Sequence, residues 1–395
     1  MSYPPLAIPE SITGIARVLE DAGYEAWCVG GSLRDTLLGY PHSDFDIATS
    51  AKPEEVQRLF PRTVAVGIKY GTVGVLDRNR VLHEVTTFRR DVVTDGRHAV
   101  VEYGVSLEED LARRDFTINA MAYHPLRKEW RDPFGGERDV AARLVRAVGD
   151  PDERFREDYL RVLRALRFSA RFDFTIEPKT WAAAQAAAPG LAQLSAERVR
   201  DEWFKGLQTA RSIRELASLW VRSGAARTWI PELHTGLFSS GQVPEPPATL
   251  RRDPVILTAL LTGAGSSVLR RLKASNAEIE RAERLERGPG QPEAMDQRSV
   301  RRWLSVTGSG ADDLASLWML RHQAEPPWLA TVGEIRRRGD PLTRSDLAIS
   351  GSDLQALGAT GPEIGRTLAT LLERVLEDPA LNTREHLLSL ARELQ

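Results

Sequence analysis

The stretch that decides the fold of this chain reads Gly30-Gly31-Ser32-Leu33-Arg34-Asp35, and Asp44-Phe45-Asp46 follows it closely. The apolar run Ala26–Val29 leads into the glycines, as a buried strand would. A glycine turn lets backbone N–H groups approach a triphosphate, because no Cβ stands in the way. Carboxylates at i and i+2 on a strand point to one face and can share a divalent cation. The stretch therefore predicts a phosphate cradle beside a metal site, which nucleotidyl transfer requires.

Length and composition set the frame for this interpretation. The chain has 395 residues, a net charge of −2 and 27% charged residues, so we expect a globular protein of several modules rather than a disordered one. The sequence has neither a signal-peptide pattern nor an apolar run of about 18–20 residues, which argues against secretion and membrane insertion. The single Cys28 favours a cytoplasmic location and is predicted to be buried.

The first 150 residues alternate between helical and strand-like patterns, which predicts an α+β head with a mixed β-sheet. A helix is expected over 8–22, stopped by Gly23, and a second begins near Pro53. The strand-like runs are 25–29, 44–48, 63–66, 71–76 and 80–87. Residues 89–105 are expected to form a mobile loop or hairpin before a capping box at Ser106 and Glu109. From Asp150 onward the pattern is helical almost throughout.

Three further groups of residues carry candidate chemistry. Glu84 lies in a strand-like run and is a candidate third carboxylate, either a metal ligand or the acceptor of a hydroxyl proton; the alternative is an ion pair with nearby arginines. Arg113-Arg114-Asp115 leads into the apolar segment 116–121, which places the two arginines at the edge of the core. Glu157-Asp158 continues with Arg161, Arg164 and Arg167 in steps of three, which on one helix would keep Asp158, Arg161 and Arg164 on one face. The alternative for this last group is a surface stripe of ion pairs.

These motifs, in this order, resemble the bacterial class II tRNA nucleotidyltransferase and poly(A) polymerase family. The resemblance is close over residues 25–210, faint over 210–340, and returns at 351–365. The segment Gly67–Val73 is similar to the branch specific for tRNA. The motifs that carry it are Gly30–Asp35, Leu37–Gly39, Asp44–Thr49, Glu84–Arg89, Arg113–Met121, Asp132–Gly136 and Arg156–Arg161.

The resemblance implies a seahorse-like molecule: a head (1–149), a helical neck with the base-selecting motif (150–210), a helical body (211–335) and a tRNA-binding tail (336–395). It implies addition of CMP and AMP from CTP and ATP to the 3′-hydroxyl of tRNA, with contacts to the acceptor stem and elbow. Either a monomer or a weak dimer is expected. The alternatives are an enzyme that adds only CC or only A, a poly(A) polymerase, and an inactive RNA-binding protein.

The resemblance and the residue chemistry together assign roles. Asp44 and Asp46 are expected to hold two Mg²⁺ ions. Gly30, Gly31, Ser32 and Arg34 are expected to bind phosphate. The resemblance assigns Arg113, Arg114 and Asp115 to the sugar and phosphates of the incoming nucleotide. Asn119 is a candidate partner for the ribose 2′-hydroxyl, and Arg164 and Arg167 complete the predicted nucleotide site.

Base choice without a template is assigned to Asp158 and Arg161. Cytosine and adenine both present an exocyclic amine, a donor, beside a ring nitrogen acceptor. A carboxylate only accepts and a guanidinium only donates, so this pair fits both bases. Uracil and guanine present the reverse pattern, which costs about 1–3 kcal/mol per mismatch.

Two expectations concern the extent of the reaction and the C-terminal half. The span between Glu84 and Arg113, which the family uses to switch from C to A, is about two residues shorter than the pattern of full-length loops, and Ala99 stands where relatives often have proline. Asp95 and Arg97 remain as a candidate ion pair, and complete CCA addition is favoured over CC addition.

The body carries no His-Asp pair, so no phosphohydrolase activity is expected. A discontinuous basic surface for RNA is predicted from Arg270, Arg271, Lys273, Arg301, Arg302 and Arg336–Arg338.

Overall fold

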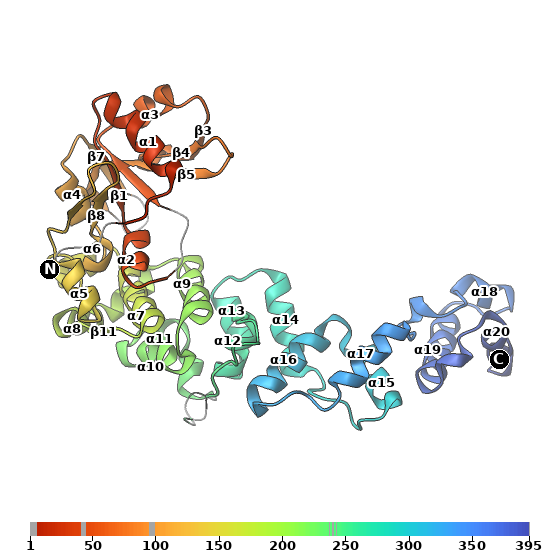
Figure 1. Ribbon diagram of the computed structural model, residues 1–395. Coiled ribbons are helices and arrows are strands. Elements are labelled where there is room, and N and C mark those ends of the chain that lie inside the picture. The colour runs from red at the N-terminus through yellow and green to blue at the C-terminus, as the bar shows by residue number, and fades with distance from the viewer. Residues whose placement is uncertain are drawn as a thin grey trace. The chain divides into compact units, whose positions relative to one another are not determined.

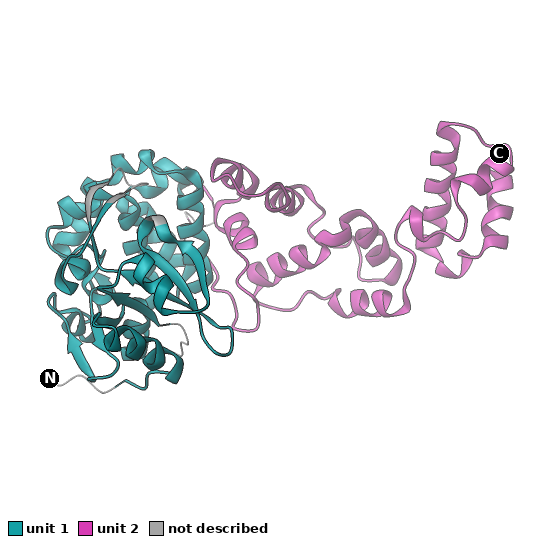
Figure 2. Cartoon of the chain, turned by 90° about the horizontal axis from the view of Figure 1, so that it is seen from above, with its two compact units in different colours: residues 1–234 teal, residues 235–395 magenta. Residues whose placement is uncertain are grey.

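The computed structural model describes residues 6–40, 45–94, 99–236, 238, 241 and 243–394. The chain divides into two compact units, residues 1–234 and 235–395 (Figure 2). The side chain of Asp44 and the Asp95–Arg97 pair lie outside the described residues. No helix in the described part of the chain is both long and apolar enough to cross a membrane.

A seven-stranded mixed sheet forms the head of the first unit (Figure 1). Its strand order is β3-β4-β5-β2-β1-β8-β9. The β2–β5 pair is parallel and the other neighbouring pairs are antiparallel. The strands are β1 (Ala26–Val29), β2 (Asp46–Thr49), β3 (Thr63–Gly67), β4 (Thr72–Leu76), β5 (Leu82–Thr87), β8 (Ala122–His124) and β9 (Glu129–Arg131). The five strands expected from the sequence up to residue 87 are present, and the predicted α+β fold class is confirmed.

Helices α1 (Glu10–Asp21) and α3 (Pro53–Leu59) pack against the sheet. Ile12, Ile15 and Leu19 supply the buried side of α1, as their helical spacing predicted. The other face of the sheet is covered in part by α4 (Leu107–Ala112), whose leucines pack on Trp27 and Ala48. Cys28 is buried as expected; burial raises the pKa of its thiol and the charge of Asp46 adds to that effect.

The segment after β5 is the expected hairpin. β6 (Arg89–Thr94) pairs antiparallel with β7 (Ala99–Tyr103), and α4 then begins with the predicted capping box of Ser106 and Glu109. Two short parallel strands, β10 (Leu144–Val145) and β11 (Thr175–Ile176), interrupt the helical pattern that follows the head.

The rest of the first unit is helical and packs against the edge of the head. Its central helix is α7 (Leu160–Phe172), whose apolar face is buried and which packs closely against α9 (Ala196–Thr209). Figure 1 shows these helices beneath the sheet, with α2 (Gly31–Leu37) reaching toward them. The other helices of this unit are α5 (Gly136–Ala141), α6 (Pro151–Glu157), α8 (Pro178–Ala186), α10 (Ile213–Ser223) and α11 (Ala225–Trp229).

The second unit consists of helices and short 3-10 turns in its described residues. Part of its core lies among the last three helices, where Leu354, Leu371 and Leu387 are buried together. Its helices are α12 (Pro254–Thr262), α13 (Gly265–Arg271), α14 (Asn276–Arg287), α15 (Gln297–Thr307), α16 (Ala311–His322), α17 (Leu329–Arg338), α18 (Gly351–Ala356), α19 (Pro362–Glu377) and α20 (Arg384–Glu393).

Candidate active site

A pocket of about 550 Å³ in the first unit gathers most of the predicted site residues. Eight arginines and three aspartates contribute to its lining, so positive charge prevails there. Among the predicted residues that the structure describes, Ser32 and Glu84 are absent from the lining. The lining comprises Gly30, Gly31, Arg34, Asp46, Arg113, Arg114, Asp115, Asn119, Asp158, Leu160, Arg161, Arg164, Arg167, Phe168, Arg171 and Arg198.

The glycine turn lies where β1 ends and α2 begins. Gly30 has φ of +81°, a conformation that L side chains rarely adopt, and a Cβ there would lie 2.9 Å from Nη1 of Arg114. The backbone conformation therefore requires glycine at this position, whereas the end of the flexible Arg114 side chain adds little to that constraint. Ser32 is buried beside the turn, and its hydroxyl donates to the Val29 carbonyl at 3.5 Å.

A phosphate-binding arginine at the start of a helix is expected to be exposed. Arg34 is instead buried. Its Nε donates to Asp35 at 2.8 Å and its Nη1 donates to the Asn119 side chain. The guanidinium carbon lies 5.0 Å and 4.6 Å from the ring centroids of Phe168 and Phe172. Burial lowers the pKa of Arg34, and the neighbouring Asp35 opposes this effect.

Three acidic side chains each hold two arginines of the pocket. Asp35 accepts from Arg34 at 2.8 Å and from Arg171 at 3.0 Å. Asp110, on α4, accepts from Arg113 at 3.0 Å and from Arg114 at 3.3 Å. Glu202, on α9, accepts from Arg167 at 2.5 Å and lies 3.7 Å from Arg164. These acids fix the arginine side chains before any ligand binds.

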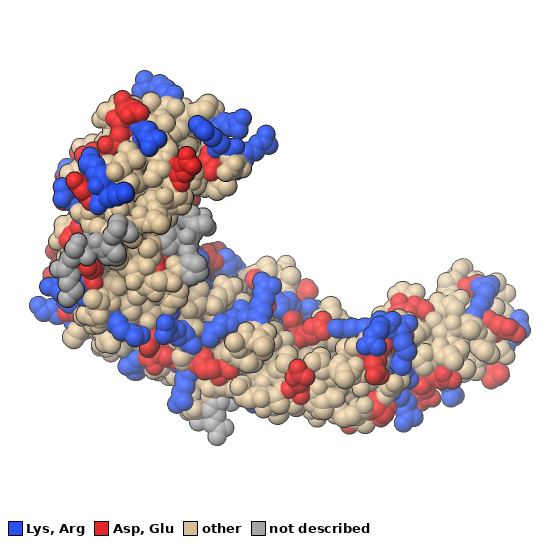
Figure 3. Space-filling model, in the orientation of Figure 1, with Lys and Arg blue, Asp and Glu red and all other residues tan. Residues whose placement is uncertain are grey.

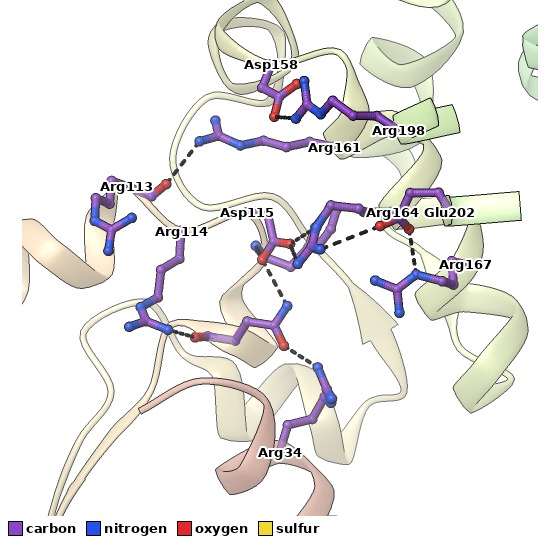
Figure 4. A network of polar contacts seen from close by, with 12 residues as sticks. Arg34, Arg113, Arg114, Asp115, Asp158, Arg161, Arg164, Arg167, Arg198 and Glu202 are labelled. Carbon is purple, nitrogen blue, oxygen red and sulfur yellow. Dashed lines mark hydrogen bonds and ion pairs between the residues drawn. The ribbon is translucent and has the colours of Figure 1, made fainter. Parts of the chain in front are cut away.

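Asp115 lies at the centre of this network (Figure 4). Its Oδ2 accepts from Nε of Arg164 at 2.7 Å, and its Oδ1 accepts from Nδ2 of Asn119 at 2.9 Å. Burial alone would raise the pKa of Asp115, but the Arg164 charge and the Asn119 hydrogen bond lower it below its ordinary value. Asp115 is therefore ionised and links the helical part of the pocket to Asn119 and Arg34.

The expected single helical face of Asp158, Arg161 and Arg164 is wrong at its first member. Asp158 has extended backbone angles, φ of −154° and ψ of 104°, and separates α6 from α7. Its Oδ1 accepts from the Leu160 backbone N–H at 3.0 Å, a local bond that competes with a continuous helix. Its Oδ2 accepts from Arg198 at 2.7 Å, so the side chain is oriented by α9 as well (Figure 4).

Arg161 is held at the start of α7 by three acceptors. It donates to the carboxylate of Glu157 at 2.5 Å and to the Arg154 carbonyl at 3.0 Å. A third bond, of 3.1 Å, runs to the carbonyl of Arg113 and joins the helical part of the pocket to the head (Figure 4). The structure thus places Asp158 and Arg161 in one pocket, each oriented by several bonds.

The carboxylates expected to bind metal lie on one face of the sheet. Ile47 of β2 is paired with Val85 of β5, and both are buried, so Asp46 and Glu84 lie side by side on the opposite face. Both acids are exposed, and no described cation forms an ion pair with Glu84. Carboxylate oxygens are the ligands that Mg²⁺ prefers, so this donor set fits the ion. The described residues contain no complete cluster of three metal-binding side chains, and Asp44 lies outside them.

Sequence reasoning missed several residues of this site, four of which carry most of its additional chemistry. Arg171 and Phe168 follow Arg164 and Arg167 at helical spacing on α7, so extending that pattern would have found them. Arg198 and Glu202 lie on α9, outside the motifs that the sequence analysis selected. Their partners are 35 to 40 residues away in sequence, and no local pattern signals such pairs.

Replacing Glu202 by glutamine is expected to destabilise the protein by about 1–3 kcal/mol, because Arg164 and Arg167 then face a neutral amide in a buried setting. Urea unfolding measures the change in free energy. The matched control is Asp201→Asn on the same helix, whose ion pair with Arg200 is exposed, with an expected change below about 0.5 kcal/mol. Equal losses for the two variants would contradict the buried network.

The basic surface predicted for the second unit needs one correction. Arg301 is buried and donates to the backbone carbonyls of Leu376 and Glu377 at 2.8 Å and 2.9 Å. It closes the C-terminal end of α19, where free carbonyls need donors, and is therefore structural. Arg302 is exposed but pairs with Glu373 and Glu377 on the same helix.

Two known families match parts of this chain. Residues 26–146 match the family described as "Poly A polymerase head domain", and residues 173–237 match "Probable RNA and SrmB- binding site of polymerase A". Together with the sheet and its arginine-rich pocket, these matches define the class: a nucleotidyltransferase with a head of the poly(A) polymerase type.

Curated relatives and solved structures narrow the class. The CCA-adding enzyme of Enterococcus faecalis is 36% identical over 391 residues, covering 96% of this chain and 94% of the relative. That of Geobacillus stearothermophilus is 34% identical over 390 residues, with 95% and 94% covered. The crystal structure of the Bacillus stearothermophilus CCA-adding enzyme in complex with CTP matches with a TM-score of 0.85 at 33% identity, covering 99% of this chain and 98% of that one.

A more distant structure, the Thermotoga maritima CCA-adding enzyme complexed with tRNA, has a TM-score of 0.64 at 21% identity and shows the shared fold. It covers 97% of this chain and 95% of that one. The chain belongs to the family of CCA-adding enzymes, the class II branch of the tRNA nucleotidyltransferases.

Proposed function

We propose that this chain builds the CCA end of tRNA, adding CMP and AMP from CTP and ATP to the 3′-hydroxyl and releasing pyrophosphate. The observation that carries the proposal is the pocket in which Asp46 lies with eight arginines. A nucleoside triphosphate bears several negative charges, and preoriented guanidinium groups bind phosphate oxygens through two parallel hydrogen bonds. The curated relatives that cover nearly the whole chain carry the name of this activity.

In this proposal the arginines hold the triphosphate and the sheet holds the reacting groups. Arg113 and Arg114, fixed by Asp110, bind phosphate and sugar, while the turn at Gly30 and Gly31 offers backbone N–H groups. Arg34 and Asp115 orient Asn119 for the ribose 2′-hydroxyl. Because these groups are fixed before binding, little of the interaction energy is lost to ordering them.

The metal ions of this proposal belong to the carboxylate face of the sheet. Asp46 and Asp44 would hold two Mg²⁺ ions, with Glu84 as a further ligand or as the acceptor of the hydroxyl proton. When bound, such ions lower the pKa of the attacking hydroxyl and neutralise the departing pyrophosphate. Glu84 is exposed and lies beside Asp46 on the same face of the sheet, so it is available to receive that proton.

Base choice falls to Asp158 and Arg161. Each Asp158 oxygen already accepts one hydrogen bond, from Leu160 or Arg198, and each retains a second lone pair for an exocyclic amine. Arg161 faces the ring nitrogen as the donor. Cytosine and adenine satisfy this pair, whereas uracil and guanine place like groups opposite each other.

We further infer a division of labour along the chain, in which the head (1–149) and neck (150–210) perform the chemistry in the cytoplasm. The helical body (211–335) and tail (336–395) hold the tRNA acceptor stem and elbow, largely through backbone charge and shape.

The proposal predicts a single-nucleotide extension when tRNA ending in CC is incubated with ATP alone. A tRNA that lacks all three nucleotides is expected to gain two with CTP alone and three with CTP and ATP together. Product lengths on a sequencing gel decide between the outcomes. Efficient addition of two cytidines without addition of the adenosine would reassign the chain to the CC-adding enzymes.

A further inference from the structure

The sheet face that carries Asp46 and Glu84 continues outward into a strip of exposed apolar side chains. Val64 and Val66 on β3 and Leu82 on β5 are 43%, 44% and 44% exposed. They are among the few large hydrophobic side chains that the described part of the chain exposes to this extent. Exposure of apolar area next to a catalytic face commonly marks a binding surface.

Strand register places this strip directly beside Glu84. Gly74 on β4 lies opposite Glu84 on one side and opposite Val64 on the other. A Cβ on Gly74 would lie 2.6 Å from Cδ1 of Leu82 and 2.7 Å from Cγ2 of Val66, so these two side chains meet above the glycine. The intervening Val73, Val75 and Val85 are buried on the opposite face.

Basic side chains flank the far end of the strip. The Leu76 N–H donates to the Arg62 carbonyl at 3.1 Å, which places Arg62 beside the turn that joins β4 to β5. Arg78 and Arg80 belong to that turn, and all three arginines are exposed. Figure 3 shows basic side chains projecting at the tip of this part of the head. The surface thus runs from the carboxylates over apolar side chains to a group of positive charges.

We propose that this strip, formed by Val64, Val66, Leu82 and the arginines at 62, 78 and 80, binds the single-stranded 3′-terminal nucleotides of the acceptor RNA. The inference rests on the proposed function, since it requires the RNA 3′-hydroxyl to lie at Asp46 and Glu84. The nucleotides that precede this hydroxyl must then leave the site along a neighbouring surface. Apolar side chains pack against the faces of bases and riboses, and arginines neutralise the phosphates between them.

The first test replaces the apolar contacts. The double variant Val66→Ser/Leu82→Ser is expected to raise the KM for tRNA about tenfold, because apolar area that packs on bases and riboses is lost, while the KM for CTP is expected to stay unchanged. Val18→Ser is the control. Val18 is also exposed, but it lies on α1, which packs on the face of the sheet opposite the strip. Thermal unfolding verifies that each variant is folded.

The second test avoids the strands altogether. Arg62→Ala/Arg78→Ala is expected to weaken tRNA binding and to lower the slope of log affinity against log salt by about 1–2, because each lost phosphate contact reduces that slope by about one. Arg17→Ala on α1, which removes one exposed arginine away from the strip, is the control, with an unchanged slope expected. An unchanged slope in the double variant would overturn the assignment of the arginines.

A third test locates the RNA directly and separates this inference from the proposed function. A tRNA with 4-thiouridine at its last position is irradiated with the wild-type protein, and we expect crosslinks within residues 62–86. If CCA addition is normal but the crosslinks lie elsewhere, the inference is overturned and the proposed function stands. The same holds if both double variants keep the wild-type KM for tRNA. Crosslinks at the strip without any nucleotide addition overturn the function instead. A wild-type dimer that the apolar variant converts to a monomer would identify the strip as a contact between copies.

Discussion

Asp46→Ala is expected to lower nucleotide incorporation at least about 1,000-fold, because stabilisation by a metal ion is worth several kcal/mol in the transition state. Asp46 is the first residue of β2, is exposed, and lies beside Glu84 on the same face of the sheet. Affinity for tRNA is expected to stay within a few-fold of wild type, since it depends on dispersed basic residues. Incorporation of labelled CMP into tRNA that lacks its CCA end measures the first quantity, and filter binding measures the second.

Asp21→Ala provides the control for this experiment. Asp21 is the last residue of α1 and is exposed, so its loss changes the net charge by the same amount without touching the carboxylate face. Appreciable turnover of Asp46→Ala at saturating Mg²⁺ would show that the metal assignment is wrong. Parallel measurement of Glu84→Gln tests its role: a loss that higher Mg²⁺ restores indicates a ligand, and a loss independent of Mg²⁺ indicates a proton acceptor.

Asp158→Ala is expected to relax base choice, raising the use of UTP or GTP relative to CTP by about 10- to 100-fold, because the group that repels their acceptor is gone. The side chain also accepts the Leu160 N–H at the start of α7. A loss of helix support therefore has to be separated from a loss of selection. The measurement is kcat/KM for each of the four nucleoside triphosphates.

Asp150→Ala is the control that separates a loss of helix support from a loss of base selection. Asp150 caps the neighbouring α6 by accepting from the Asp152 and Glu153 N–H groups, and it does not line the pocket. Its loss is expected to cost about 1 kcal/mol of stability and to leave base preference unchanged. Asp158→Asn retains an acceptor for Leu160 but introduces a donor, so it too is expected to admit the wrong bases. A uniform fall for all four nucleotides in Asp158→Ala would indicate a supporting role only.

Local sequence determined the helices and strands of the head and the face of the sheet on which its proposed catalytic carboxylates lie. Alternation along 82–87 fixes Glu84 on the face opposite Val85, and the alternation of Asp46 with the buried Ile47 does the same within β2. The glycine at position 30 and the capping box at Ser106 likewise act within a few residues of themselves. Such features depend on backbone geometry and side-chain period, which the sequence specifies directly.

Only the tertiary structure decided how the charges are paired. Asp158 leaves the helix because a local hydrogen bond and the distant Arg198 compete with helical geometry. Glu202 selects Arg164 and Arg167, and Arg301 turns inward to the carbonyls of α19 instead of toward solvent. An arginine is compatible with a surface, a pocket or a buried helix end. Its long side chain pairs with whichever acceptors packing brings near. For Arg167 and Arg301 those acceptors lie tens of residues away in the chain.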